Sequence, residues 1–427
     1  MQELKYLNKY LFKYKWKLLL GIIITIISRI FSLFTPKLVG NSMTLIEKSN
    51  LDIDQIGGKL EVLLLRNILI ILSASLISGF FTFWMRQTII NVSRYIEFDL
   101  KNEVYNHYQS LCSLFYKTNR TGDLMSRITE DVSKVRMYVG PAIMYSINTI
   151  TLFVIVISFM FSISPSLTIY SLIPLPILSF TIYKLSKKIH LKSTLVQEYL
   201  AKLSTFSQEV FSGIKIIKSY NMQKVVSTKF DNFSNSSKER SIDLSKVQAL
   251  FFPLMILLIG ISNIIVIYVG GNQYIEGKID IGVIAEFIIY ITMLTWPVAV
   301  VGWVTSIIQQ AEASQKRINS FLKSKPSVCN YGKILNFENG DINFKNVSFK
   351  YPETNLYALK NINFSISSGN TLGIIGKTGS GKSTILELII RSYDVTSGEI
   401  YLDDKILSSY DLQSLKSFIS YVPQNPF

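Results

Sequence analysis

Long uncharged, apolar segments alternate with polar segments over the first three quarters of this chain. Lys, Arg, Asp and Glu are all absent from four blocks of 19, 47, 29 and 25 residues, which are Asn67 to Met85, Met137 to Tyr183, Val247 to Ile275 and Phe287 to Ala311. A bilayer core ~30 Å thick requires about 20 apolar residues per helix, because each residue adds ~1.5 Å along the axis. The blocks therefore predict membrane-spanning helices and exclude a purely soluble protein.

Six spans fit this pattern. They are roughly Leu18 to Val39, Val62 to Met85, Val139 to Phe161, Leu167 to Tyr183, Val247 to Gly270 and Val283 to Thr305. The 47-residue block holds the third and fourth spans, because its one turn signal, Ser162 to Ser166, allows only a short connection between them. Six spans return the chain to the side on which it started.

The basic residues predict which side of the membrane each connection occupies. Residues 1–17, 86–138 and 184–246 carry net charges of +4, +2 and +7, whereas residues 41–61 and 271–282 carry −2 and −1. Lys and Arg concentrate in the cytoplasmic loops of membrane proteins. We therefore expect a multi-pass protein of the cytoplasmic membrane with both termini in the cytoplasm.

The two long inner connections show helical periodicity, as in the spacing of Ile96, Leu100 and Val104. Helices are therefore expected to extend far into the cytoplasm. Such helices either only expose charged faces to water or contact something that is attached on the inside.

The pattern changes from helical to strand-like near the C-terminal end. Residues 307–340 are expected to form a linker. Asp341 to Tyr351 alternates in two registers, which predicts a strand with a β-bulge, and Asn361 to Ser367 predicts a second strand. The apolar run Leu372 to Ile375 predicts a buried strand that leads into a glycine-rich loop.

That loop, Gly376 to Thr384, fits the phosphate-binding pattern G-x-x-x-x-G-K-[ST], and the apolar segment Ile385 to Ile390 after it predicts a helix. Glycines allow the backbone to approach a phosphate, and successive N–H groups at a helix N-terminus point at the anion. An ordinary glycine-rich turn is the alternative. The expected ATP-binding residues are Gly376, Lys377, Thr378, Gly379, Ser380, Gly381, Lys382, Ser383 and Thr384. Within this set, Lys382 is expected to reach the β and γ phosphates, and the Ser383 hydroxyl is expected to bind Mg²⁺.

With these features the chain resembles a half-transporter of the ATP-binding cassette (ABC) exporters. The resemblance implies a multi-domain fold: an all-α six-helix transmembrane domain with long cytoplasmic helical extensions (residues 1–306), the linker (307–340), and a truncated α/β P-loop nucleotide-binding domain (341–427). It also implies that Tyr351 stacks on adenine, with a core tyrosine as the alternative. Gln424, in Tyr421-Val-Pro-Gln424, is similar to the family's glutamine loop, which implies a catalytic contact with Mg²⁺ and the attacking water, alongside Lys382.

Two segments of the inner connections, Thr121 to Arg127 and Glu209 to Lys215, are similar to the family's coupling helices. One departure from the family is serious. The 427 residues contain no LSGGQ-like signature and no apolar strand that ends in Asp-Glu. We therefore expect a fragment or a truncated product that does not turn over ATP as it stands.

The resemblance implies ATP-driven export of a solute, which is a drug, a lipid or a peptide, by a homodimer or a heterodimer with a second half-transporter. A nucleotide-gated channel or membrane-anchored sensor that does not pump is the alternative from a different class, and an importer is a weaker one. The +15 net charge does not indicate nucleic-acid binding, because the tail from Asp341 onward has eight basic and eight acidic residues. Cys112 and Cys329 form no CxxC pair, so neither a zinc site nor a disulfide framework is expected.

Charged and polar groups inside the spans are candidates for the substrate pathway, because burying them in lipid is costly. Arg29 lies eleven residues into the first span and is expected to face a central cavity. The alternatives are that its long side chain reaches the membrane surface, or that the span extends beyond the bilayer. A direct pair between Arg29 and Glu286 is a further possibility. The weaker lining candidates are Asn148, Asn263 and Trp296.

Overall fold

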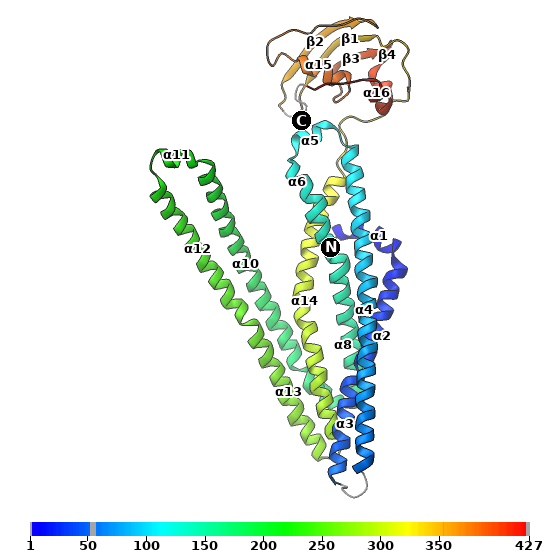
Figure 1. Cartoon of the computed structure of the whole chain (residues 1–427), viewed down its shortest axis with the longest axis vertical. Helices are drawn as coiled ribbons and strands as arrows, with labels where there is room; N and C mark the ends of the chain where they lie inside the picture. The colour runs from blue at the N-terminus through cyan, green and yellow to red at the C-terminus, as the bar shows by residue number, and fades with distance from the viewer. Residues whose placement is uncertain (1, 52–56, 353, 424–427) are drawn as a thin grey trace. The chain divides into compact units, whose positions relative to one another are not determined.

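The computed structural model describes residues 2–51, 57–352 and 354–423 of the chain (Figure 1). These residues form two compact units, and each is assembled from separate stretches of sequence. The sheet unit, as we call it, comprises Met1–Tyr6, Glu97–Ser133 and Ala313–Phe427. The helical unit comprises Leu7–Ile96 and Lys134–Glu312.

Six helical stretches of the described residues are long and apolar enough to cross a membrane, and each contains one expected span. They are Lys15–Ser49, Leu60–Ser110, Thr121–Ile163, Pro165–Ser212, Gln223–Ile275 and Ile281–Leu322. The prediction of six spans is therefore confirmed by length and composition. The helices are η1 Glu3–Leu7, α1 Asn8–Lys13, α2 Lys15–Ser32, α3 Phe34–Leu51, α4 Gly57–Ser110, α5 Ser113–Thr118, α6 Thr121–Ser126, η2 Arg127–Asp131, α7 Val132–Met137, η3 Tyr138–Ala142, α8 Ile143–Ile163, α9 Pro165–Leu172, α10 Pro174–Ser212, α11 Ile214–Ser219, α12 Gln223–Ala249, α13 Phe251–Ile275, α14 Ile281–Leu322, α15 Lys382–Ile389, η4 Leu407–Ser409 and α16 Leu412–Phe418.

The connection between the third and fourth spans is as short as the turn signal predicts. Ser164 has an extended backbone and caps α9, accepting a hydrogen bond from the Leu167 N–H. Pro165 follows at the first helical position, where its missing N–H costs nothing. The chain therefore reverses at a single residue between α8 and α9.

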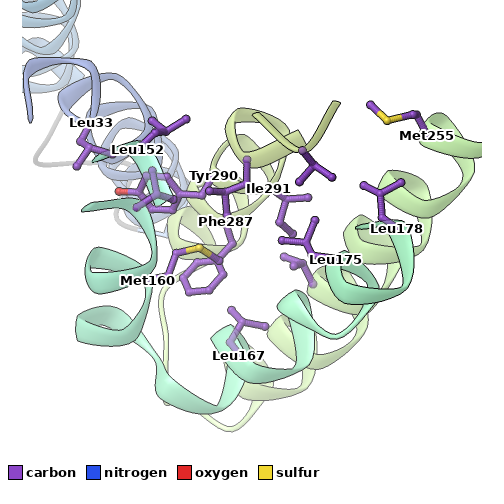
Figure 2. Close-up of a cluster of buried hydrophobic side chains, with 14 of the residues drawn as sticks. Leu33, Leu152, Met160, Leu167, Leu175, Leu178, Met255, Phe287, Tyr290 and Ile291 are labelled. Atoms are coloured by element: carbon purple, nitrogen blue, oxygen red, sulfur yellow. The ribbon is translucent and has the colours of Figure 1, made fainter. Parts of the chain in front are cut away.

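An apolar core in the helical unit joins α8, α9, α10, α13 and α14 (Figure 2). The α14 members recur at helical spacing, with Phe287, Tyr290, Ile291 and Leu294 all fully buried. Lipid is as apolar as these side chains, so close van der Waals packing between helices stabilises such a core within a bilayer. The other buried members include Leu33, Leu152, Met160, Leu167, Leu175, Leu178 and Met255.

The backbones of α3 and α14 approach each other closely at two glycines. A Cβ atom on Gly282 would lie 2.0 Å from the Gly40 carbonyl oxygen, and one on Gly40 would lie 2.7 Å from the Gly282 carbonyl oxygen. Any side chain at either position would push the helices apart.

The sheet unit contains a four-stranded antiparallel sheet with strand order β2-β1-β3-β4. Strand β1 (Ile342–Lys350) has irregular register against β2 (Tyr357–Ile366) after Phe344, which confirms the predicted β-bulge. The remaining strands are β3 (Ser397–Leu402) and β4 (Lys405–Ile406). Helix α15 packs against this sheet through the buried side chains of Ile385 and Leu388.

The prediction of a buried strand at Leu372 to Ile375 is wrong for this structure. The segment has no regular secondary structure, and Leu372, Ile374 and Ile375 are 45%, 36% and 98% exposed. A central strand requires hydrogen-bonding neighbours, and none of the strands in the described residues pairs with this segment. Without such neighbours, its apolar side chains have no sheet to pack against.

Helix α14 continues to Leu322, so residues 307–322 of the predicted linker are helical. The boundaries of the domains stay a prediction. Asp403 organises the end of the remaining linker. Its carboxylate accepts hydrogen bonds from the backbone N–H groups of Glu338, Asn339, Gly340 and Asp341, at 2.7 to 3.1 Å.

Candidate functional site

The phosphate-binding loop lies in the sheet unit, between the irregular segment and helix α15. Residues 376–380 are exposed, and α15 begins at Lys382. Gly379 and Gly381 have φ angles of +82° and +91°, which side-chain-bearing residues rarely adopt. Gly381 also lies so close to β2 that a Cβ atom on it would be 2.5 Å from the Ala358 carbonyl oxygen. These glycines turn the chain sharply into the helix.

Lys382 folds back over its own loop. Its Nζ atom donates hydrogen bonds to the carbonyl oxygens of Gly376 and Lys377, at 2.9 and 2.8 Å. These acceptors are neutral, so a phosphate oxygen is a stronger partner for the ammonium group. The site therefore has an ammonium group beside the N-terminus of α15 whose present acceptors are weaker than a phosphate oxygen.

The two hydroxyl residues at the start of α15 have different surroundings. Ser383 is exposed, whereas Thr384 is 4% exposed and its side chain points into the unit. Thr384 Oγ1 lies 3.0 Å from the Tyr351 hydroxyl. Of the two hydroxyl groups, that of Ser383 is therefore the one exposed enough to hold a metal ion. Backbone N–H donors, an ammonium group and an exposed hydroxyl together fit a nucleotide triphosphate with Mg²⁺.

Tyr351 lies directly after β1 with its ring edge-on to Phe349 and Tyr393, at centroid distances of 5.0 and 5.6 Å. Its hydroxyl donates to Glu387 Oε2 at 3.1 Å. Burial raises the pKa of Tyr351, so the phenol keeps its proton at neutral pH. The ring is half-buried, and its role in adenine binding stays a prediction. Gln424 lies outside the described residues.

The connection between the second and third spans contacts this site through a segment that the sequence prediction missed. Helix α5, which precedes the predicted segment Thr121 to Arg127, carries Leu114 against the apolar core of the sheet. The coupling role of Thr121 to Arg127 stays a prediction. Lys117 on α5 donates to Glu387 Oε1 at 3.2 Å and to the Tyr393 hydroxyl at 3.0 Å. Desolvation disfavours its charge, but these hydrogen bonds outweigh that effect and raise the pKa of Lys117. No helix forms at Leu111–Cys112 or at Asn119–Arg120. These two breaks in the helical structure make α5 a separate short helix.

The second predicted coupling segment, Glu209 to Lys215, spans a real break in the helical unit. Helix α10 ends at Ser212, Gly213 follows as its cap, and the short helix α11 begins at Ile214. Its contact with a nucleotide-binding domain stays a prediction.

In the helical unit, the structure brings two of the candidate pathway residues together. Arg29 Nε donates to Asn148 Oδ1 at 2.6 Å, and both side chains are half-buried. Glu286, which is 5% exposed, instead accepts a hydrogen bond from the Tyr290 hydroxyl at 2.6 Å. A direct pair between Arg29 and Glu286 is not among the contacts of the described residues.

The other two candidates differ from each other. Asn263 has a buried Oδ1 atom without a hydrogen-bond partner in the described part of the chain. Trp296 is 67% exposed within this single chain.

Comparison with known proteins identifies the family. A family model of the ABC transporter transmembrane region matches residues 18–298, and one described as ABC transporter matches residues 359–427. The multidrug resistance-like ATP-binding protein MdlA of Buchnera aphidicola subsp. Schizaphis graminum is 31% identical over 95% of this chain and 69% of its own length. The probable multidrug resistance ABC transporter ATP-binding/permease protein YheI of Bacillus subtilis is 29% identical over 95% of this chain and 68% of its own. The ATP-dependent lipid A-core flippase of Photobacterium profundum is 28% identical over 78% of this chain and 57% of its own. The chain, with six candidate spans followed by the predicted phosphate-binding loop, belongs to the ABC transporter family.

Proposed function

We propose that this protein binds ATP and Mg²⁺ at the loop Gly376 to Thr384 and couples them to export of a solute across the cytoplasmic membrane. The observation that carries the proposal is the geometry of Lys382, whose ammonium group donates to two neutral carbonyl oxygens beside the N-terminus of α15. Six candidate spans in the same chain supply the part that crosses the membrane.

The residues have distinct roles in this proposal. Lys382 exchanges its carbonyl acceptors for phosphate oxygens, and Ser383 offers its exposed hydroxyl to the metal ion. Tyr351 provides a ring for the adenine base, and Gln424 is expected to contact Mg²⁺ and the attacking water. Bound ATP supplies the free energy of γ-phosphate hydrolysis. A dimer of half-transporters, identical or different, is the proposed working unit.

The transported solute is proposed to be a drug, a lipid or a peptide, which agrees with the multidrug and lipid A names of the relatives. Two cavities, of about 510 and 600 Å³, are each large enough for such a molecule. The larger one lies between α10 and α14, with Ile182 and Val298 at one end and Lys187, His190 and Gln309 at the other. Arg29 and Asn148 are proposed as a polar pair that lines the pathway, with Asn263, Glu286 and Trp296 as weaker candidates.

Photolabelling with an azido-ATP analogue tests the nucleotide assignment. The Lys382→Ala variant removes the ammonium group and should lose most labelling of the 427-residue protein. Lys416→Ala removes an exposed lysine on α16 and should label like the wild type. Equal labelling of the two variants would refute the assignment.

Transport itself is tested in liposomes that contain the reconstituted protein and a candidate solute. Solute accumulation against a gradient, dependent on hydrolysable ATP, supports a pump. Nucleotide-gated flux that only follows the gradient would instead establish the channel alternative.

A further inference from the structure

A hydrogen-bonded chain links helix α5 to the Tyr351 ring through Glu387. Lys117 Nζ donates to Glu387 Oε1 at 3.2 Å, and the Tyr351 hydroxyl donates to Glu387 Oε2 at 3.1 Å. Thr384 Oγ1 lies 3.0 Å from the same hydroxyl. Each oxygen of the carboxylate therefore has its own donor, one from the connection between the second and third spans and one from the end of β1.

The chemistry of the four groups fixes the direction of these hydrogen bonds. An ionised carboxylate can only accept, so the single proton of Tyr351 points to Glu387. The hydroxyl of Thr384 must then donate to the Tyr351 oxygen, because that oxygen has no second proton. The tyrosine hydroxyl is consequently held from both sides, while its ring contacts Phe349 and Tyr393 edge-on.

Lys117 also balances the negative charge of the Glu387 carboxylate. The Glu387 side chain is 21% exposed and lies on the helix whose N-terminus forms the phosphate-binding loop. An unpaired carboxylate there would repel a triphosphate. The ammonium group of Lys117 neutralises it, and a second hydrogen bond to the Tyr393 hydroxyl holds that ammonium in place.

We propose that Glu387 is a positioning residue for the nucleotide base: it fixes the Tyr351 ring through its hydroxyl, and Lys117 neutralises and orients Glu387. The inference rests on the proposed function, because it takes Tyr351 to be the ring that stacks on adenine. A ring held before the base arrives loses less conformational entropy on binding. Helix α5 thereby contributes to base recognition without contacting the nucleotide.

The test compares two ligands of the 427-residue protein in detergent: MgATP, which has a base, and magnesium tripolyphosphate, which has none. Both are measured by competition against an azido-ATP analogue. Glu387→Leu should weaken MgATP binding by about three- to tenfold without weakening tripolyphosphate binding, because it frees the Tyr351 hydroxyl and removes no phosphate contact. Lys117→Met leaves the Glu387 carboxylate unpaired, so it should weaken both ligands, and MgATP more than tripolyphosphate. A merely structural role would weaken both ligands alike.

Tyr351→Phe separates positioning from packing, because it keeps the ring and removes only the hydroxyl. It should reproduce the MgATP loss of Glu387→Leu, and the double variant should lose no more than either single variant. Lys117→Arg keeps the positive charge and should retain most of the affinity. Glu399→Leu is the matched control, because Glu399 also accepts a hydrogen bond from a tyrosine, Tyr401, at a site on β3.

Several results would overturn the inference: unchanged MgATP binding in Glu387→Leu, tighter MgATP binding in that variant, or parallel loss of both ligands. Additive losses in the double variant would also contradict it. Lys382→Ala should weaken both ligands, because it removes a phosphate contact. A wild-type protein that binds neither ligand would refute the proposed function and, with it, this inference.

Discussion

Arg317 and Asp131 are 186 residues apart in the sequence, and their side chains form a bidentate ion pair within the sheet unit. Arg317 Nε donates to Asp131 Oδ2 at 2.9 Å, and Arg317 Nη2 donates to Oδ1. Asp131 is 1% exposed and ends the π-helical turn η2, whereas the Arg317 side chain is 53% exposed. The pair therefore connects the C-terminal part of α14 to the π-helical turn that follows α6.

The unequal burial of this pair predicts unequal effects of substitution. Arg317→Met leaves a buried carboxylate without its partner and should destabilise the protein by roughly 3 kcal/mol. Asp131→Asn leaves a half-exposed guanidinium that water can solvate, so its effect should be smaller. Thermal unfolding in detergent measures both. Adding Asp131→Asn to Arg317→Met should restore part of the lost stability; a further loss would contradict this account.

The contact between Arg29 and Asn148 predicts coupling between the first and third spans. Replacing either residue by Leu leaves the other polar group unpaired, so the double variant should lose less than the sum of the two single losses. We expect a coupling energy of about 1 kcal/mol in thermal unfolding. Glu286→Gln is the control, because Glu286 contacts Tyr290 instead. Strict additivity of the Arg29 and Asn148 variants would show that the contact contributes nothing.

The hydrogen bonds of the Asp403 carboxylate lead us to expect that the stability of residues 338–341 depends on pH. Desolvation opposes its ionisation, but the N–H groups of residues 341, 338, 339 and 340 outweigh that effect and hold the pKa of Asp403 below its usual value. A lowered folded-state pKa gives stability that is present above the unfolded-state pKa of about 3.9 and is lost as the pH falls through the folded-state pKa.

Hydrogen exchange of residues 338–341 measures this effect. Asp403→Asn should exchange faster than the wild type at pH 7, and the difference should disappear at a pH below the folded-state pKa. Asp404→Asn changes an exposed neighbour and should exchange like the wild type. A difference that persists unchanged in acid would rule out the carboxylate as the cause.

The charge bias predicts a topology that cysteine labelling can test, in a background with Cys112→Ser and Cys329→Ser. Ser219, on α11, and Glu276 are both exposed in this structure and are suitable positions. In intact cells, a membrane-impermeant thiol reagent should label Glu276→Cys and leave Ser219→Cys unlabelled until the membrane is opened. Labelling of Ser219→Cys in intact cells would overturn the predicted orientation.

The sequence by itself determined the features that depend on local pattern. Uncharged runs of membrane length have few alternatives to spanning helices, so all six spans were predictable. The glycine loop was equally predictable, because the positive φ angles of Gly379 and Gly381 require that residue type. The change in the alternation of apolar residues between Phe344 and Val347 likewise predicted the β-bulge in β1.

Tertiary structure alone decided the partners of these elements. The Leu372 to Ile375 segment has the apolar character of a buried strand but lacks neighbouring strands in the described residues, and strand formation depends on those neighbours. Lys117 has no local signal for its partner, because Glu387 lies 270 residues away and only packing of α5 on the sheet brings the charges together. Arg29 contacts Asn148 rather than Glu286 for the same reason. Helix packing determines which polar side chains lie at the same level and face each other, and the periodicity of the sequence does not reveal that packing.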